Sequence, residues 1–391
     1  MIPWSKPNLE KKDLVHLNRA FKSSWISGGQ YINKLENILK KILKAKNVLV
    51  TSSGTAAIHL AYLAIGLKKG NEIIVPGYGY LAAANMSKLL NLRIVFADVD
   101  PNSFCVTEKN IKKVITKKTK AIVITHTYGN MCEVDKISRL AKKRKIILVE
   151  DAAEALGSKF KSKFSGTIGD IGIYSFHAAK NITTGEGGAV LVQNKKLFER
   201  LKLFRNHGVL KKRYYHVVPG HNFRLSNLLA SIGYSQLTRI RKTIENRKKI
   251  FSFYIKHLNK KKFEMQLITK NTNFVPSTVS IKINNNFNQK KRDSIMNTLE
   301  KKGIELVDIT SEEIKDAVIE MIENLKPNKQ SRPEDEELQK KFRSLYASNI
   351  KRTNDSEDKN DNFYRAINKL HGQIRSRFST RFLRENKNWT R

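Results

Sequence analysis

The sequence predicts an α/β fold: a seven-stranded, mostly parallel sheet between helices, with a smaller C-terminal domain. Seven short runs of apolar and β-branched residues, typical of buried strands, recur before residue 193. Segments long enough for a helix separate the first five runs, as in strand–helix–strand units. The connection between the last two runs has no room for a clear crossover helix. We therefore expect the final strand to run antiparallel to its neighbour.

The expected strands are Val48–Val50, Glu72–Val75, Arg93–Phe96, Ala121–Ile124, Ile146–Val149, Ile173–Phe176 and Ala189–Val192. The apolar residues of Tyr31–Leu43 recur at spacings that place them on one helix face. Further helices are expected over Lys195–Leu203, from Asn227 to about Arg241, and over Arg247–Leu258 and Arg292–Lys302. A strand of the smaller domain is expected over Thr278–Ile283.

Lys180 lies between the last two expected strands, just before the glycine-rich turn Thr184–Gly188. At a position held between two strands, desolvation lowers the pKa of a lysine and favours its neutral amine. A neutral amine can condense with an aldehyde. The usual aldehyde is pyridoxal 5'-phosphate, PLP. The alternative is a surface lysine in a hairpin loop of a lysine-rich chain.

Two further strand ends carry candidate residues, because ligands of an open α/β sheet bind at the carboxyl ends of its strands. Gly54, Thr55 and Ala56 open a helix after the first strand, where backbone N–H groups attract an anion. A Ser or Thr helix cap has the same appearance. Tyr80 follows the second strand as a candidate ring-stacking residue, with an ordinary surface tyrosine as the alternative.

Asp151 leaves the fifth strand, and an acidic side chain there is costly unless it has a partner. A pyridine nitrogen of PLP, held protonated by the carboxylate, is such a partner. The alternative is an Asp that caps the next helix. No His or Cys pair within one element has the spacing of metal ligands, so we expect no metal site.

The composition limits the other functional classes. The net charge of +39 would suit nucleic acid, an anionic membrane or acidic small molecules. Its lysines are dispersed, however, and no aromatic-interleaved basic motif is present, so we favour solvated faces. No apolar run approaches the roughly 18 residues of a membrane span. Two cysteines and no apolar leader lead us to expect a cytoplasmic protein.

Together these segments resemble the DegT/StrS-type nucleotide-sugar aminotransferases, PLP enzymes of the aspartate-aminotransferase fold. The matching segments occur in family order: Trp25–Gly29, Ser53–Ala57, Glu150–Glu154, Tyr174–Lys180 with Thr184–Gly188, and Gly220–Leu225. Five such segments in order make the resemblance specific. We expect it to cover about residues 1–306, with Val218–Arg224 similar to perosamine-synthase-like members.

The resemblance implies a role for each matching residue. Lys180 carries the cofactor covalently and moves a proton between cofactor and substrate carbons. Asp151 matches the partner of the ring nitrogen, and Tyr80 the aromatic residue that stacks on the ring. The residues that match the phosphate cradle are Gly54, Thr55, Ala56 and Ser175.

Three positions refine this implication. Glu154 stands where the family often has His or Gln near the phenolic oxygen of the cofactor. Asn222 matches a residue that reaches the phosphate from the neighbouring subunit, which implies a homodimer with composite sites. A lysine at position 180 argues against the dehydratase branch of the family, which has histidine there.

We expect a cofactor-binding large domain over residues 1–240, a truncated small domain over 241–309, and an atypical helical tail with mobile linkers over 310–391. The ending His371–Asn386 is similar to the end of surface-polysaccharide glycosyltransferases. The expected function is transfer of an amino group from glutamate to a keto group of a nucleotide-activated deoxysugar. The alternatives are a truncated or fused family member that binds PLP without activity, and a basic nucleic-acid-binding protein.

Overall fold

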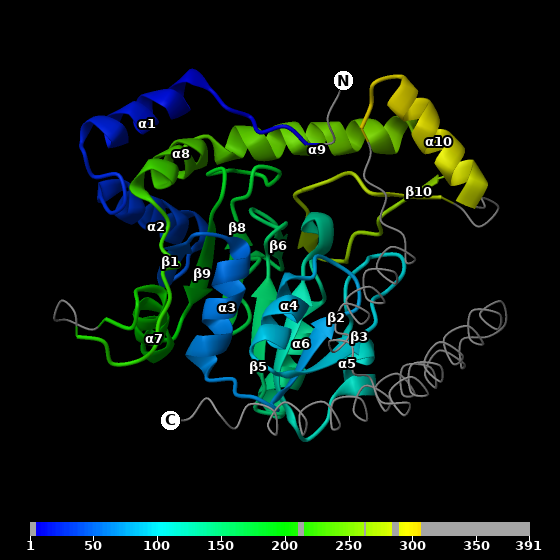
Figure 1. Cartoon of the computed structure of the whole chain (residues 1–391). Coiled ribbons are helices and arrows are strands. Elements are labelled where there is room, and N and C mark those ends of the chain that lie inside the picture. The colour runs from blue at the N-terminus through cyan, green and yellow to red at the C-terminus, as the bar shows by residue number, and fades with distance from the viewer. Residues whose placement is uncertain (1–4, 210–214, 262, 284–288, 306–391) are drawn as a thin grey trace, which may run out of the picture. The chain divides into compact units, whose positions relative to one another are not determined.

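The computed structural model describes residues 5–209, 215–261, 263–283 and 289–305 (Figure 1). These residues belong to a compact unit over Met1–Leu306, and a second unit begins at Val307. The tail expected over residues 310–391 lies outside the described residues.

A seven-stranded sheet forms the centre of the first unit, with the strand order β1-β9-β8-β5-β4-β2-β3. Strand β9 is antiparallel to both of its neighbours, and the pairs from β8 to β3 are parallel. The expected seven strands and the antiparallel last strand are therefore confirmed. The strands are β1 (Asn47–Thr51), β2 (Glu72–Pro76), β3 (Arg93–Ala97), β4 (Thr119–Thr125), β5 (Ile147–Asp151), β8 (Ile171–Ser175) and β9 (Gly188–Val192).

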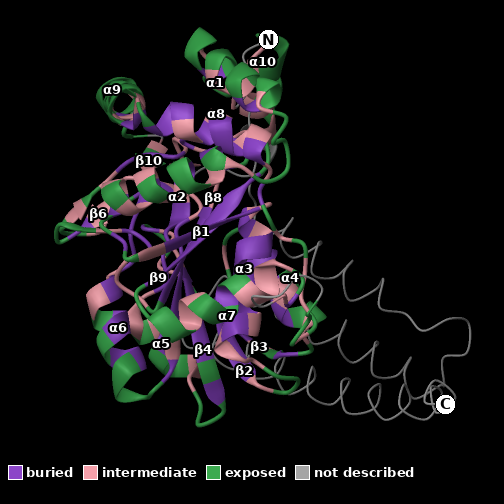
Figure 2. Cartoon of the chain, turned by 90° about the vertical axis from the view of Figure 1, so that its left-hand side faces the viewer, coloured by how far each residue is buried: buried purple, intermediate pink, exposed green. Residues whose placement is uncertain are grey.

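Helices cover both faces of this sheet, and its strands form the buried centre of the view in Figure 2. Successive side chains of a strand point to opposite faces, so both faces need apolar residues and a helical cover. One face packs against α3 (Gly54–Ile65), α4 (Ala82–Leu89) and α7 (Lys195–Arg205). The other packs against α2 (Gln30–Leu43), α5 (Glu108–Val114), α6 (Val134–Lys143) and α8 (Asn227–Leu237).

Two helices are present here as expected, but the break between them, expected between Arg241 and Arg247, lies earlier in the chain. Helix α8 ends at Leu237, and α9 (Ile240–His257) begins three residues later. The Thr238 hydroxyl donates to the Ser235 carbonyl at 2.7 Å, which offers the backbone an alternative to helix continuation. The Arg239 guanidinium is held by Asp13 of α1 (Lys11–Lys22), so the break serves a tertiary contact.

Smaller elements complete the described chain. Strands β6 (Lys159–Phe160), β7 (Lys163–Phe164) and β11 (Thr272–Asn273) form one small sheet. Strands β10 (Phe263–Met265) and β12 (Ile281–Ile283) form another, so the strand expected from Thr278 begins at Ile281. Helix α10 (Gln289–Lys301) agrees with the expected helix. No helix among the described residues is both long enough and apolar enough to cross a membrane.

Candidate site residues from several strands lie along one edge of the large sheet, the edge formed by the strand ends. Strand register pairs Thr125 with Asp151, Ser175 with Gly188, and Gly188 with Thr51. The carboxyl ends of β1, β4, β5 and β8 therefore meet the start of β9 at this edge. This is the edge where open α/β sheets bind ligands.

Candidate functional site

Lys180 is held against Glu154 at this edge. Its Nζ lies 3.0 Å from Glu154 Oε1, and the two side chains are only 21% and 22% exposed. The Lys180 N–H donates to the His177 carbonyl at 2.9 Å, which fixes the turn after β8. The Lys180 amine is therefore partly buried and has a fixed carboxylate partner, unlike a fully solvated surface lysine.

Asp151 ends β5 and is 6% exposed. Burial raises the pKa of this carboxyl, and the nearby Lys180 charge opposes the rise. Its Oδ1 accepts one N–H, from Ala153, at 3.1 Å. The chain continues through turns after Asp151, and the next described helix begins at Lys195, so the helix-cap alternative is wrong.

The N-terminus of α3 meets the end of β8. Ser53 caps the helix by accepting the Ala56 N–H at 3.0 Å, so the helix-cap interpretation of this segment also holds. The N–H groups of Gly54 and Thr55 stand in the first turn, where no carbonyl of the helix reaches them. A Cβ on Gly54 would lie 3.0 Å from the Cβ of Ser175, so glycine permits the close approach of helix and strand.

Two predicted site residues are exposed to solvent. Tyr80 follows β2 and is 86% exposed. Asn222 is exposed, and its Oδ1 accepts from Arg224 Nε at 2.9 Å. Among the described residues, neither makes a hydrogen bond with Lys180, Asp151 or Glu154.

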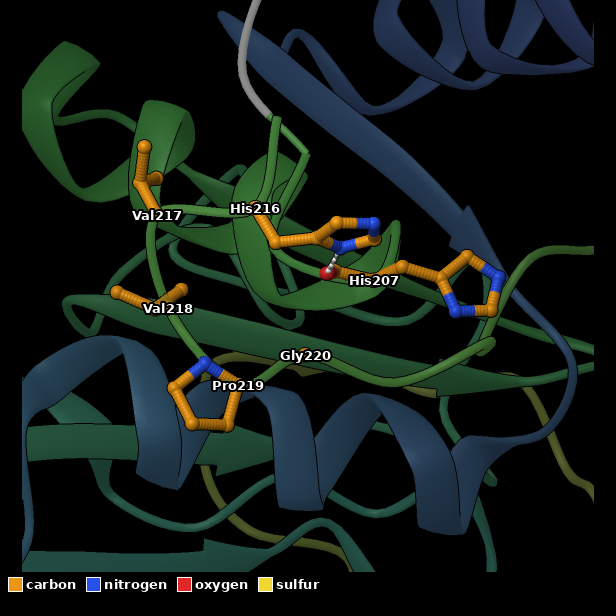
Figure 3. Close-up of a pocket in the computed structure, with 6 residues that line it drawn as sticks. All are labelled: His207, His216, Val217, Val218, Pro219 and Gly220. Atoms are coloured by element: carbon orange, nitrogen blue, oxygen red, sulfur yellow. Dashed lines mark hydrogen bonds between the residues drawn. The ribbon is translucent and has the colours of Figure 1, made fainter. Parts of the chain in front are cut away.

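A surface pocket lies next to the Asn222 segment (Figure 3). His216 Nδ1 is 2.7 Å from the His207 carbonyl oxygen, and the two histidines stand on facing segments of the loop. The lining residues are His207, His216, Val217, Val218, Pro219 and Gly220. None of them belongs to the Lys180 cluster.

Sequence reasoning missed the segment that follows β4. His126 Nε2 lies 2.9 Å from Glu150 Oε2, and both side chains are fully buried. His126 Nδ1 accepts the Cys132 N–H at 3.3 Å, so the ring proton is on Nε2 and donates to Glu150. Tyr128 donates its N–H to Glu154 Oε2 at 2.9 Å. Their position in the sequence was the signal that could have found them, because they directly follow β4, which lies beside β5 in the sheet.

The cluster presents the groups that PLP requires. Lys180 supplies an amine for the aldehyde. The buried Asp151 forms no ion pair among the described residues, and its carboxylate would suit a protonated ring nitrogen. The first turn of α3 with Ser175 suits a phosphate. No group of three His, Cys, Asp or Glu in the described part of the chain has a metal-binding arrangement.

Comparison with known families agrees with this geometry. The DegT/DnrJ/EryC1/StrS aminotransferase family matches residues 7–357 of the chain. The match continues past residue 306, where we expected the resemblance to end.

Two curated relatives are similar over most of their length. The GDP-perosamine synthase of Escherichia coli O157:H7 is 40% identical over 260 residues, which are 66% of this chain and 71% of the relative. The UDP-4-amino-4,6-dideoxy-N-acetyl-β-L-altrosamine transaminase of Campylobacter jejuni (strain 81-176) is 37% identical over 266 residues, 66% of this chain and 70% of the relative.

The fold is also similar to solved structures. A Streptococcus pneumoniae protein, described as a sugar aminotransferase and solved in its PLP form, superimposes with a TM-score of 0.74 at 25% identity. The superposition covers 77% of this chain and 83% of that chain.

Proposed function

From the premise that the chain belongs to the DegT/DnrJ/EryC1/StrS aminotransferase family, and is a PLP-dependent sugar aminotransferase, we propose its reaction and its site residues. It moves an amino group from an amino acid, with glutamate as the expected donor, to a keto carbon of a nucleotide-activated deoxysugar. The product feeds glycan or polysaccharide synthesis. The observation that supports this best is the Lys180 amine, held 3.0 Å from Glu154 Oε1 at the same strand edge as Asp151.

Bound PLP supplies an electron sink for the carbon that loses its proton, and the protein residues direct that chemistry. Lys180 is the covalent attachment point, and its Nζ carries the proton to and from the reacting carbon. Glu154 holds the Lys180 nitrogen through the contact between Nζ and Oε1. The amine thereby stays at the reacting centre throughout the cycle.

Asp151 holds the proton of the ring nitrogen. Burial raises the pKa of the Asp151 carboxyl. A cationic partner therefore stabilises the charged form of this carboxyl more strongly than it would in water. The Asp151 carboxylate would keep the ring nitrogen protonated and would itself stay charged beside it. Its fixed negative charge would thereby support the electron-sink chemistry that the cofactor supplies.

The phosphate is held by Gly54, Thr55, Ala56 and Ser175. The α3 N-terminus contributes backbone donors and the positive end of the helix dipole, and Ser175 adds a hydroxyl. Tyr80, exposed on the loop after β2, stacks on the cofactor ring. Asn222, also exposed, completes the cradle of a partner subunit, so the active protein is a homodimer.

The remaining assignments follow from this proposal. The large domain spans residues 1–240 and the small domain begins at 241, with a distinct tail from 310. The dispersed positive charge attracts anionic nucleotide sugars in the cytoplasm. The similarities reported above give no support to an inactive relative or to a nucleic-acid-binding protein. Lys180 disfavours a dehydratase.

The reverse reaction provides the test. GDP-perosamine and UDP-4-amino-4,6-dideoxy-N-acetyl-β-L-altrosamine are each offered to the PLP-loaded protein with 2-oxoglutarate, and glutamate is measured. We expect glutamate from at least one amino sugar, and none from the Lys180→Ala variant beyond the uncatalysed rate. PLP-loaded protein that forms glutamate from free amino acids but from neither nucleotide sugar would overturn the substrate assignment.

A further inference from the structure

Tyr128 has a backbone conformation that is unusual for a tyrosine. It lies in the short 3-10 turn Thr127–Gly129 after β4, with φ 57° and ψ 18°. This left-handed conformation is unfavourable for an L-residue, and for a bulky aromatic residue it is rare. Such strain persists only where surrounding contacts hold it in place.

The contacts that hold Tyr128 come from a distant part of the chain. The Ser277 N–H donates to the Tyr128 carbonyl at 2.9 Å, and Arg247 of α9 donates to the Ser277 carbonyl at 2.6 Å. A Cβ on the next residue, Gly129, would lie only 2.0 Å from the Val275 carbonyl oxygen. The turn is therefore fixed by contacts with the segment Val275–Ser277, which are separate from its contact with Glu154.

On the cluster side, the strained backbone directs one hydrogen bond. The Tyr128 N–H donates to Glu154 Oε2 at 2.9 Å, while Glu154 Oε1 lies 3.0 Å from Lys180 Nζ. One carboxylate thus bridges the backbone of Tyr128 and the amine of Lys180. A right-handed residue at position 128 would direct this N–H elsewhere.

The Tyr128 side chain reaches a second wall of the site. Its hydroxyl lies 2.8 Å from the Tyr78 hydroxyl, and Tyr78 stands in the loop after β2, two residues before Tyr80. Burial raises the pKa of both phenols, so both stay protonated and their bond persists over the physiological range. Phe104 packs beside both rings, with centroids 5.5 Å from Tyr78 and 6.2 Å from Tyr128.

We propose that Tyr128 is a positioning residue that couples two walls of the active site, the Glu154–Lys180 pair through its N–H and the Tyr80 loop through its hydroxyl. The inference rests on the proposed function, because it assumes a cofactor at Lys180. The role assigned to Tyr128 is indirect, through Glu154 and through the loop that bears Tyr80. Its effect is to set the direction of the Glu154 carboxylate and the place of the loop that bears Tyr80.

The backbone role is tested with Tyr128→Gly and Tyr128→Ala, which both remove the ring. Glycine adopts positive φ readily and alanine does not, so only the glycine variant keeps the N–H directed at Glu154. The readout is the pH midpoint of the visible absorbance of PLP bound at Lys180. We expect the alanine midpoint to lie lower than the glycine midpoint by about half a unit, about threefold in proton affinity, because a less directed carboxylate favours the protonated nitrogen less.

The hydroxyl role is tested with Tyr128→Phe, Tyr78→Phe and the double variant. We expect each single variant to slow the half-reaction with glutamate about tenfold, and the double variant to be no slower than either, because one shared bond is lost in all three. Tyr31→Phe is the matched control. It also loses a partly buried hydroxyl contact, to His16 Nδ1 at 3.0 Å, and should keep the wild-type rate.

Equal midpoints for the alanine and glycine variants, or additive losses in the double phenylalanine variant, would overturn the positioning role while leaving the proposed function intact. An equal loss in Tyr31→Phe would also overturn it. Wild-type protein that gains no visible absorbance with PLP would instead overturn the proposed function, and this inference with it.

Discussion

The Asp151 carboxyl is the group in the cluster that depends most on a partner. It is 6% exposed and accepts one backbone N–H through Oδ1. Its pKa is raised by burial, and the Lys180 charge offsets only part of that rise. A fixed cation stabilises a buried carboxylate whose pKa is raised by burial. For this reason we assign Asp151 as the partner of the protonated ring nitrogen.

Replacing Asp151 by Asn should separate the binding of PLP from the catalysis of the half-reaction with glutamate. The amide has nearly the same shape, so Asp151→Asn should retain much of the PLP. It should slow the half-reaction with glutamate by about 10²–10³-fold, since a preorganised charge at the reacting centre is lost. Stopped-flow absorbance of the loaded protein gives this rate. An unchanged single-turnover rate would show that Asp151 has only a structural role.

Single residues also show how far sequence reasoning reaches. Lys180, Asp151 and Glu154 were predicted because each follows an apolar strand or stands in a recognisable segment, and the structure places them together. Tyr128 was missed. Its importance lies in a positive φ and in a contact with Ser277, 149 residues away in the chain, and neither leaves a local pattern in the sequence.

Among the elements, α1 is joined to the segment between α8 and α9 by an ion pair between Asp13 and Arg239. Arg239, between α8 and α9, donates to both carboxylate oxygens of Asp13 at 2.6 Å. Burial raises the pKa of Asp13, but the hydrogen bonds from Arg239, the Glu10 N–H and Ser235, together with the Arg239 charge, outweigh it, and the net pKa is lowered. Because the folded pKa is lowered, the pair stabilises the fold fully above the ordinary pKa of Asp. That stabilisation is lost as the pH falls through the folded pKa.

We therefore expect Asp13→Asn to lower the free energy of unfolding by about 1–3 kcal/mol at pH 7. The difference from wild type should shrink as the pH falls below about 4, near the ordinary pKa of Asp. Urea unfolding at several pH values measures this.

Asp135→Asn is the matched control. Asp135 pairs with Lys161 on the surface, where such pairs contribute about 0–1 kcal/mol. A loss in Asp13→Asn no larger than in this control, or a loss that grows with acidity, would contradict the account.

At the same scale, the strands were predictable, whereas the position of the helix break was not. Each strand of the large sheet is a short apolar run bounded by polar residues, so its existence follows from local sequence. The break after Leu237 arises where Arg239 turns to meet Asp13, 226 residues earlier in the chain. Helical periodicity carries no information about such a distant partner.

For the whole molecule, the central structural proposal is a dimer with shared sites. Asn222 is exposed and makes no hydrogen bond with the Lys180 cluster within its own described chain. An amide there can donate to the phosphate of a partner subunit without adding charge.

Mixing two variants tests the shared site. Lys180→Ala removes the attachment point and Asn222→Ala removes the partner's contribution, so each homodimer should bind PLP poorly. In a mixed dimer, both lesions fall in one site and the other site is intact. Subunit exchange should then restore up to roughly half of the wild-type occupancy per mixed dimer, as two-fold pairing requires. The absence of any recovery despite proven exchange would count against a composite site.

The attachment point of the cofactor is the most direct test of the whole account. The PLP-loaded protein is reduced with borohydride, digested, and mapped by mass spectrometry. The account predicts the pyridoxyl group on Lys180, the lysine held by Glu154 at the carboxyl edge of the sheet. A label on the nearby Lys159, Lys161 or Lys163 instead would contradict it.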